Sequence, residues 1–154
     1  MEIDVYENGR HRLLLTSDYS PNHAMINEFQ TSFFTCKMRR IELCGKELEG
    51  YEVNEEGMFV KLHFTIRNMT NEILGMFRED FEISCDDGAP YEAEECFDAE
   101  KQFPDEYALK PQEERTGCLV FIIASATKKI CLSYTEYFDD ESKGKTYRLK
   151  YKIK

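Results

Sequence analysis

The residues best suited to bind a ligand in this sequence form an acidic tract, CDDGAPYEAEECFDAE, over residues 85–100. Clustered carboxylates can hold Ca²⁺, which takes roughly six to eight oxygen ligands from flexible loops. Asp86, Asp87, Glu92 and Glu94 are the candidate ligands, although their spacing does not match an EF-hand loop. A divalent-metal site, with calcium as the ion, is therefore one interpretation of the tract.

Two other interpretations of the tract are open. A solvated acidic edge would discourage edge-to-edge strand pairing. A docking surface is the alternative, because aromatic side chains are interleaved with the acids and aromatics are enriched at protein interfaces. The candidate partner-binding residues are Tyr91, Glu92, Glu94, Glu95 and Phe97. An acidic surface would attract a basic partner protein.

The sequence contains no motif for catalysis. A G-x-S-x-G elbow, an H-E-x-x-H pair, a C-x-x-C pair and a glycine-rich phosphate loop are all absent. His63 lies on the polar side of an alternating strand, far in sequence from the other two histidines. The six cysteines are most simply buried thiols that act as small hydrophobic residues. We therefore expect no enzyme activity and no cofactor, with no catalytic residue to name.

Charge further narrows the classes of partner. The net charge is −10, and residues 79–114 hold fourteen acidic residues against two basic ones. Such a segment repels a phosphate backbone, and no groove of arginine and lysine is evident elsewhere. We expect no nucleic-acid partner.

The sequence also bears on membranes and export. No apolar run approaches the roughly 20 residues that cross a bilayer. The first ten residues, MEIDVYENGR, are acidic where an export signal is basic. This favours a cytoplasmic protein if Met1 is the native start. Otherwise the chain belongs outside the cell or in the envelope, after removal of an export signal.

Alternating patterns predict the elements that position these residues. The clearest covers 57–68, where Val60, Leu62, Phe64 and Ile66 fall on one side. Asn8-Gly9 between two apolar runs predicts an N-terminal hairpin. Further strands are expected over 32–43, 71–77, 81–85, 117–125, 129–138 and 146–154, with an edge strand near 91–95. Residues 97–113 have the least strand character, with one helical turn expected around 98–103.

About eight or nine short strands separated by turns predict a sandwich or barrel of antiparallel strands. Each strand should have one buried and one solvated face. The short side chain of Asn68, at the end of its strand, is expected to bond nearby backbone. The chain is long enough for one domain, with a hairpin and connection over 1–29 and a sandwich over 30–154.

Three segments of the chain resemble a bacterial and archaeal family of uncharacterised immunoglobulin-like domains. They are FVKLHFTIRNMTNE, FEISCDDGAPY and ALKPQEERTGCLVF. The family is common in envelope lipoproteins and related in fold to secreted mycobacterial antigens. The features that match, within residues 30–137, are the strand-ending Asn68, the turn at Asp87 and Gly88 before Tyr91, and the corner and strand with Leu109, Pro111, Gly117 and Phe121.

Two features depart from the family pattern. Gln112 stands where the family prefers glycine, and the lipoprotein signal is absent. The resemblance implies an all-β, immunoglobulin-like antiparallel sandwich with an added N-terminal hairpin, and no catalytic residues. Asn68, Gly88, Pro111 and Gly117 would then be structural. We expect a binding or interaction module with an acidic surface, and a calcium-binding sandwich is the alternative.

Overall fold

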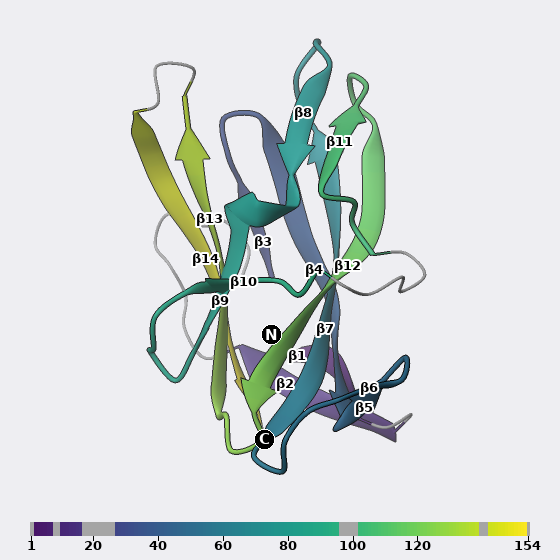
Figure 1. Ribbon diagram of the computed structural model, residues 1–154. Coiled ribbons are helices and arrows are strands. Elements are labelled where there is room, and N and C mark those ends of the chain that lie inside the picture. The colour runs from purple at the N-terminus through teal and green to yellow at the C-terminus, as the bar shows by residue number, and fades with distance from the viewer. Residues whose placement is uncertain (1, 8–9, 17–26, 96–101, 139–141, 154) are drawn as a thin grey trace.

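The structure, a computed structural model, describes residues 2–7, 10–16, 27–95, 102–138 and 142–153. Nearly all regular structure in these residues is β-strand (Figure 1), apart from the short 3₁₀ turn η1 (Arg78–Asp80). Within the same residues, no helix has the length and apolar character needed to cross a membrane. In chain order the strands are β1 (Glu2–Glu7), β2 (Arg10–Thr16), β3 (Glu28–Gln30), β4 (Phe34–Gly45), β5 (Glu47–Leu48), β6 (Tyr51–Glu52), β7 (Gly57–Asn68), β8 (Leu74–Phe77), β9 (Phe81–Cys85), β10 (Tyr91–Glu92), β11 (Glu106–Leu109), β12 (Glu114–Ala124), β13 (Lys129–Tyr137) and β14 (Lys143–Ile153).

The strands form two layers that face each other across a common core (Figure 1). One layer has the order β10, β9, β13, β14, and the other has β12, β7, β4 with β3 beside β4. Aromatic rings meet between the layers: the ring centroid of Phe81 lies 6.2 Å from that of Phe34 and 5.3 Å from that of Phe64. Such ring pairs add to the stability gained from burial alone. The predicted all-β, largely antiparallel sandwich is confirmed.

Strand β7 lies in the middle of its layer, between β4 and β12. The side chains of Val60, Leu62, Phe64 and Ile66 are fully buried, as the alternation predicts. Burial of each such side chain contributes about 1.5–3 kcal/mol to the free energy of unfolding. Because successive side chains of a strand point to opposite faces, Lys61 and every second residue from it lie on the outer face of the layer.

The outer face of this layer is covered at one end. Phe59 and Val120 point to it and are buried, with Leu48 and Val53 packed against them. Leu48 belongs to β5, which pairs with β6 in a small hairpin. The expectation of one solvated face per strand therefore fails here, because this hairpin region supplies a second, smaller core.

The N-terminal hairpin expected from its turn sequence is present, since β1 pairs with β2 along its whole length. The turn residues Asn8 and Gly9 lie outside the described residues. The hairpin does more than add two strands: β2 pairs antiparallel with β14, and β1 pairs in parallel with β4. It thereby joins the two layers into one continuous sheet of ten strands.

A β-bulge changes the alternation of β4. Phe34 and Met38 are buried as expected, but simple alternation would then place Arg40 inside the core. The pairing of β4 with β7 shifts register between Met38 and Arg40. The extra residue keeps the guanidinium outside and turns Ile41 and Leu43 into the core instead.

The segment 97–113 contains a strand that the sequence pattern does not predict. Strand β11 pairs with β8 and buries the side chains of Tyr107 and Leu109. Pro104 and Pro111 lie just beyond the two ends of β11, where a missing N–H removes no bond from the ladder. The helical turn expected around 98–103 falls largely outside the described residues.

Asn68 is fully buried at the end of β7. Its Nδ2 donates to the carbonyl oxygens of Glu72, Leu109 and Lys110 at 2.7, 3.1 and 3.1 Å. Its Oδ1 accepts from the backbone N–H and the hydroxyl of Thr70 at 2.9 and 2.7 Å. One amide group therefore joins the end of β7 to the following turn and to the corner before β12.

The corner before β12 contains a strained residue. Pro111 is exposed there, and Gln112 follows it with a φ of 64°, in the left-handed region that glycine favours. The side-chain amide of Gln112 donates to the carbonyl oxygen of Thr70 at 3.2 Å. Gly117 is buried further along β12, opposite Phe64. The resemblance expects glycine where Gln112 stands, and this φ gives the physical reason.

Replacing Asn68 with alanine should lower the free energy of unfolding by about 3 kcal/mol, because it leaves several backbone groups without their partner. Chemical denaturation measures this change. Asn54→Ala is the matched control, since the Asn54 side chain accepts one exposed backbone N–H, that of Glu56 at 3.0 Å. The control should cost under about 1 kcal/mol. Equal losses in the two variants would contradict the role assigned to Asn68.

Candidate functional site

Two of the candidate partner-binding residues bond to the edge of β12. The N–H of Glu94 donates to the carbonyl oxygen of Val120 at 2.8 Å, and the hydroxyl of Tyr91 donates to that of Ile122 at 2.7 Å. Strand β10 also pairs with β9, so this segment joins one end of the ten-stranded sheet, at β9 and β10, to the other end, at β12. The acidic tract therefore occupies hydrogen-bonding groups on an edge that would otherwise attract another strand.

Beside this segment lies an acidic recess of about 230 Å³. Its one cationic side chain among the described residues, Arg78, forms an ion pair with Asp105 and donates to the carbonyl oxygen of Phe103 at 3.3 Å. That cation is thus already held within the protein. The recess is lined by Arg78, Glu79, Glu92, Ala93, Glu95 and Asp105.

The candidate residues of the acidic tract divide between two places. Glu92 and Glu95 line the acidic recess. Asp86 and Asp87 precede β10 in the sequence, and they line a different pocket. Phe97 lies outside the described residues. The structure therefore brings Glu92 and Glu95 of the predicted docking set together at one recess, while Tyr91 and Glu94 bond to β12.

The calcium alternative needs Asp86, Asp87, Glu92 and Glu94 in one cluster, and they line no common recess. Among the described residues, no group of three or more His, Cys, Asp or Glu side chains is placed to hold a metal ion. Asp86 also uses one carboxylate oxygen to accept two backbone N–H groups. This part of the chain thus offers no ligand set on which a calcium site could be built.

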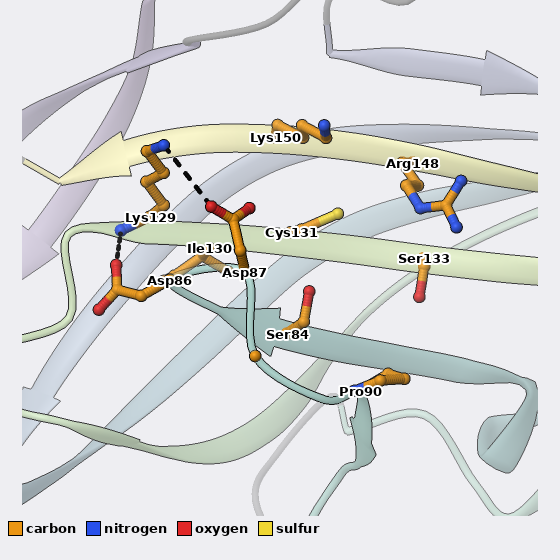
Figure 2. Close-up of a pocket in the computed structure, with 11 residues that line it drawn as sticks. Ser84, Asp86, Asp87, Pro90, Lys129, Ile130, Cys131, Ser133, Arg148 and Lys150 are labelled. Atoms are coloured by element: carbon orange, nitrogen blue, oxygen red, sulfur yellow. Dashed lines mark hydrogen bonds and ion pairs between the residues drawn. The ribbon is translucent and has the colours of Figure 1, made fainter.

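The second pocket, here called the basic pocket, has a volume of about 260 Å³ and lies over β9, β13 and β14 (Figure 2). Figure 2 shows side chains from these three strands and from the turn after β9 gathered around it. Its cationic residues come from two neighbouring strands. The lining residues are Ser84, Asp86, Asp87, Gly88, Pro90, Lys129, Ile130, Cys131, Ser133, Arg148 and Lys150.

Strand register explains why this face is hollow. Cys131 pairs with Ser84 on one side and with Lys150 on the other. One row along, Ser133 pairs with Arg148. The floor of the pocket is therefore made of small side chains, while the long cationic side chains of β14 form one wall.

A tight turn forms the opposite wall. Asp86 and Asp87 have φ values of 50° and 62°, and the N–H of Gly88 then donates to the carbonyl oxygen of Cys85 at 2.9 Å. A Cβ at Gly88 would lie 3.0 Å from that oxygen, so a larger residue would crowd the turn. The Oδ1 of Asp86 accepts the N–H of Lys129 at 2.9 Å, which fastens the turn to the start of β13.

The charges in the basic pocket are unevenly placed. Asp87 pairs with Lys129 across 3.8 Å at one end. The described part of the chain supplies no carboxylate partner for Arg148 at the other end. Burial raises the pKa of the Cys131 thiol, while Lys150 and Arg148 oppose that rise. At neutral pH the thiol is thus protonated and contributes no negative charge to the floor.

The sequence pattern shows neither that the acidic residues line a recess nor that a basic pocket exists. The signal for the basic pocket is present, because Arg148 and Lys150 alternate with buried residues and so must share the outer face of β14. What the sequence does not show is that the floor beside them is made of small residues on two other strands.

The fold also places a histidine beside a cysteine. His63 pairs with Cys118 between β7 and β12, and its Nε2 lies 2.9 Å from Oε1 of Glu42. Cys118 is buried, and burial raises the pKa of its thiol. Burial also lowers the pKa of His63. A thiol that stays protonated and covered is a poor nucleophile.

Comparison with known proteins finds solved structures with a similar fold. The chain matches no protein-family model and no curated protein. Among solved structures it is similar to the yjhA protein from Bacillus subtilis, with a TM-score of 0.63 and 13% identity over 82% of this chain and 97% of that one. It is also similar to a functionally unknown protein from Listeria monocytogenes EGD-e, with a TM-score of 0.53 and 12% identity over 91% of this chain and 86% of that one.

A third similar structure is that of ycdA, a candidate lipoprotein from Bacillus subtilis subsp. subtilis str. 168. The TM-score is 0.62 and the identity 14%, over 79% of this chain. The match spans 38% of the length of ycdA. At identities this low, the likeness to all three proteins shows a shared β-sandwich fold and nothing about activity.

Proposed function

We propose that this chain is a non-catalytic binding module of immunoglobulin-like type, which docks a basic segment of a partner protein at the acidic recess. The observation that carries the proposal is the convergence of Glu79, Glu92 and Glu95 around a hollow whose one described cation is already paired. A lysine or arginine of a partner would meet several carboxylates there. Opposite charge would also speed the encounter of the two proteins.

A carboxyl group next to the recess in the chain also favours a basic partner. Asp80 follows Glu79 in η1. Its pKa is raised from 3.8 to about 6, first by burial and then by the negative charges of Glu79 and Glu82. The Asp80 carboxyl group is thus ionised at neutral pH, although burial and the two nearby negative charges disfavour its ionised form. A cation bound nearby would relieve that cost.

Two partly exposed rings neighbour the lining residues of the recess in the sequence. Phe77, 41% exposed, directly precedes Arg78, and Tyr91, 37% exposed, directly precedes Glu92. Aromatic side chains among polar ones are typical of the centres of protein interfaces. The absence of catalysis in this proposal rests on the sequence, which has no catalytic motif, and on the protonated, buried thiol of Cys118.

Asp80→Asn should make the protein more stable at about pH 7.5 and leave it nearly unchanged at about pH 4. The pKa of this carboxyl is about 6 when folded and near 3.8 when unfolded, so the folded state holds the proton more tightly. That contribution is complete below the unfolded pKa and is lost as the pH rises through about 6. Thermal unfolding at both pH values measures it. A variant less stable than the wild type at the higher pH would overturn this account of Asp80.

Replacing Glu79, Glu92 and Glu95 together with glutamine should weaken binding of a short oligolysine peptide about tenfold at low salt. The estimate takes about 0.5 kcal/mol for each exposed ion pair. The variant should also show a weaker dependence of affinity on salt, because fewer charges take part. Isothermal titration at several salt concentrations measures both quantities.

The matched control removes the same charge elsewhere. Glu47, Glu49 and Glu52 are exposed on and between β5 and β6, outside the residues that line the recess, and are replaced with glutamine in the same way. The control variant should bind the peptide as the wild type does. If both triple variants lose affinity equally, the peptide senses only overall charge, and the recess is not the docking site.

A further inference from the structure

The second charged recess, the basic pocket, is independent of the proposed docking surface. We propose that it binds a small ligand through a phosphate or carboxylate group, held by Arg148 and Lys150 above a floor that includes the small side chains of Ser84 and Ser133. No residue that lines the basic pocket also lines the acidic recess.

The strand register gives this pocket the form of a built site. Arg148 and Lys150 lie two residues apart on β14, so both point to the same face. Each stands opposite a floor residue of β13, namely Ser133 and Cys131, and Figure 2 shows Arg148 extending from β14 toward β13 on the Ser133 side of the pocket. An anion resting on the floor would therefore lie beside both cations. The positions are fixed by the sheet and not by a mobile loop.

The distribution of charge identifies where an anion would sit. At one end Asp87 is paired with Lys129, and Asp86 is bonded to the backbone at the start of β13. Those carboxylates repel an anion from that end. At the other end the described residues form no ion pair with Arg148, and Glu82 of β9, which lies across Ser133 from it, does not line the pocket. A guanidinium group presents paired donors that match a carboxylate or a phosphate.

The size and lining of the pocket narrow the ligand further. Its volume of about 260 Å³ is below the roughly 300–1,000 Å³ typical of pockets for drug-sized ligands. Its described lining contains no aromatic ring on which a nucleobase could stack. It holds two hydroxyl groups, a thiol and three cations, with the two carboxylates at the turn. The pocket suits a compact anion better than a nucleotide.

Arg148→Gln tests the proposal with two probes, inorganic phosphate and succinate. Titration followed by NMR chemical shifts, at an ionic strength held constant with chloride, should show saturable binding of at least one probe to the wild type. The probe that binds more tightly identifies phosphate or carboxylate as the natural group. Arg148→Gln should weaken that binding about tenfold or more, because it removes charge-assisted hydrogen bonds.

Two further variants make the outcome decisive. Lys145→Gln removes one charge from an exposed residue of the same strand that does not line the pocket, and it should bind as the wild type does. Ser84→Val fills part of the floor without changing any charge, and it should also lose affinity. The triple variant of Glu79, Glu92 and Glu95 should bind these anions normally, which separates this proposal from the docking of a basic partner.

Three results would overturn the proposal. One is the absence of saturable binding of both probes to the wild type. Another is an equal loss of affinity in Lys145→Gln and Arg148→Gln, which would indicate attraction by overall charge alone. The last is unchanged affinity in Ser84→Val, which would place the anion outside the pocket.

Discussion

The pairing of β13 with its two neighbours determines what one whole layer presents to solvent. Ile130 and Leu132 are buried, so Cys131 and Ser133 between and after them must face outward. A slip of one residue would expose the buried pair and forfeit about 1.5–3 kcal/mol for each side chain. The core therefore fixes the register, and the register fixes the floor of the basic pocket.

The hairpin of β9 and β10 separates two recesses of opposite charge. Its turn, with Asp87 and Gly88, forms a wall of the basic pocket, while Glu92 and Glu95 beyond it line the acidic one. The same hairpin also covers the edge of β12 through Tyr91. A short stretch of sequence thus limits unwanted strand pairing and organises two charged surfaces. One hairpin can do both because adjacent residues of a strand face opposite ways.

Much of the fold could be predicted from the sequence, and less of the sites. Alternation in β7 and the asparagine-glycine turn led directly to correct strands, because both signals are local. The bulge at Arg40 and the strand β11 were missed, since both depend on partners distant in sequence. The acidic tract is evident in the sequence, but its division between the edge of β12 and two recesses depends on contacts made by folding. The basic pocket also depends on such contacts, although the outward position of Arg148 is predictable from the alternation of β14.

The N-terminal hairpin has a consequence for how the chain folds. Strand β2 pairs with β14, so two segments near opposite ends of the chain must find each other. Contacts between such distant residues slow folding, because the loop between them must first be closed. During synthesis the hairpin is made well before β14, its partner on one side. Until then β1 and β2 have only β4 available as a neighbour, and the ten-stranded sheet cannot be completed.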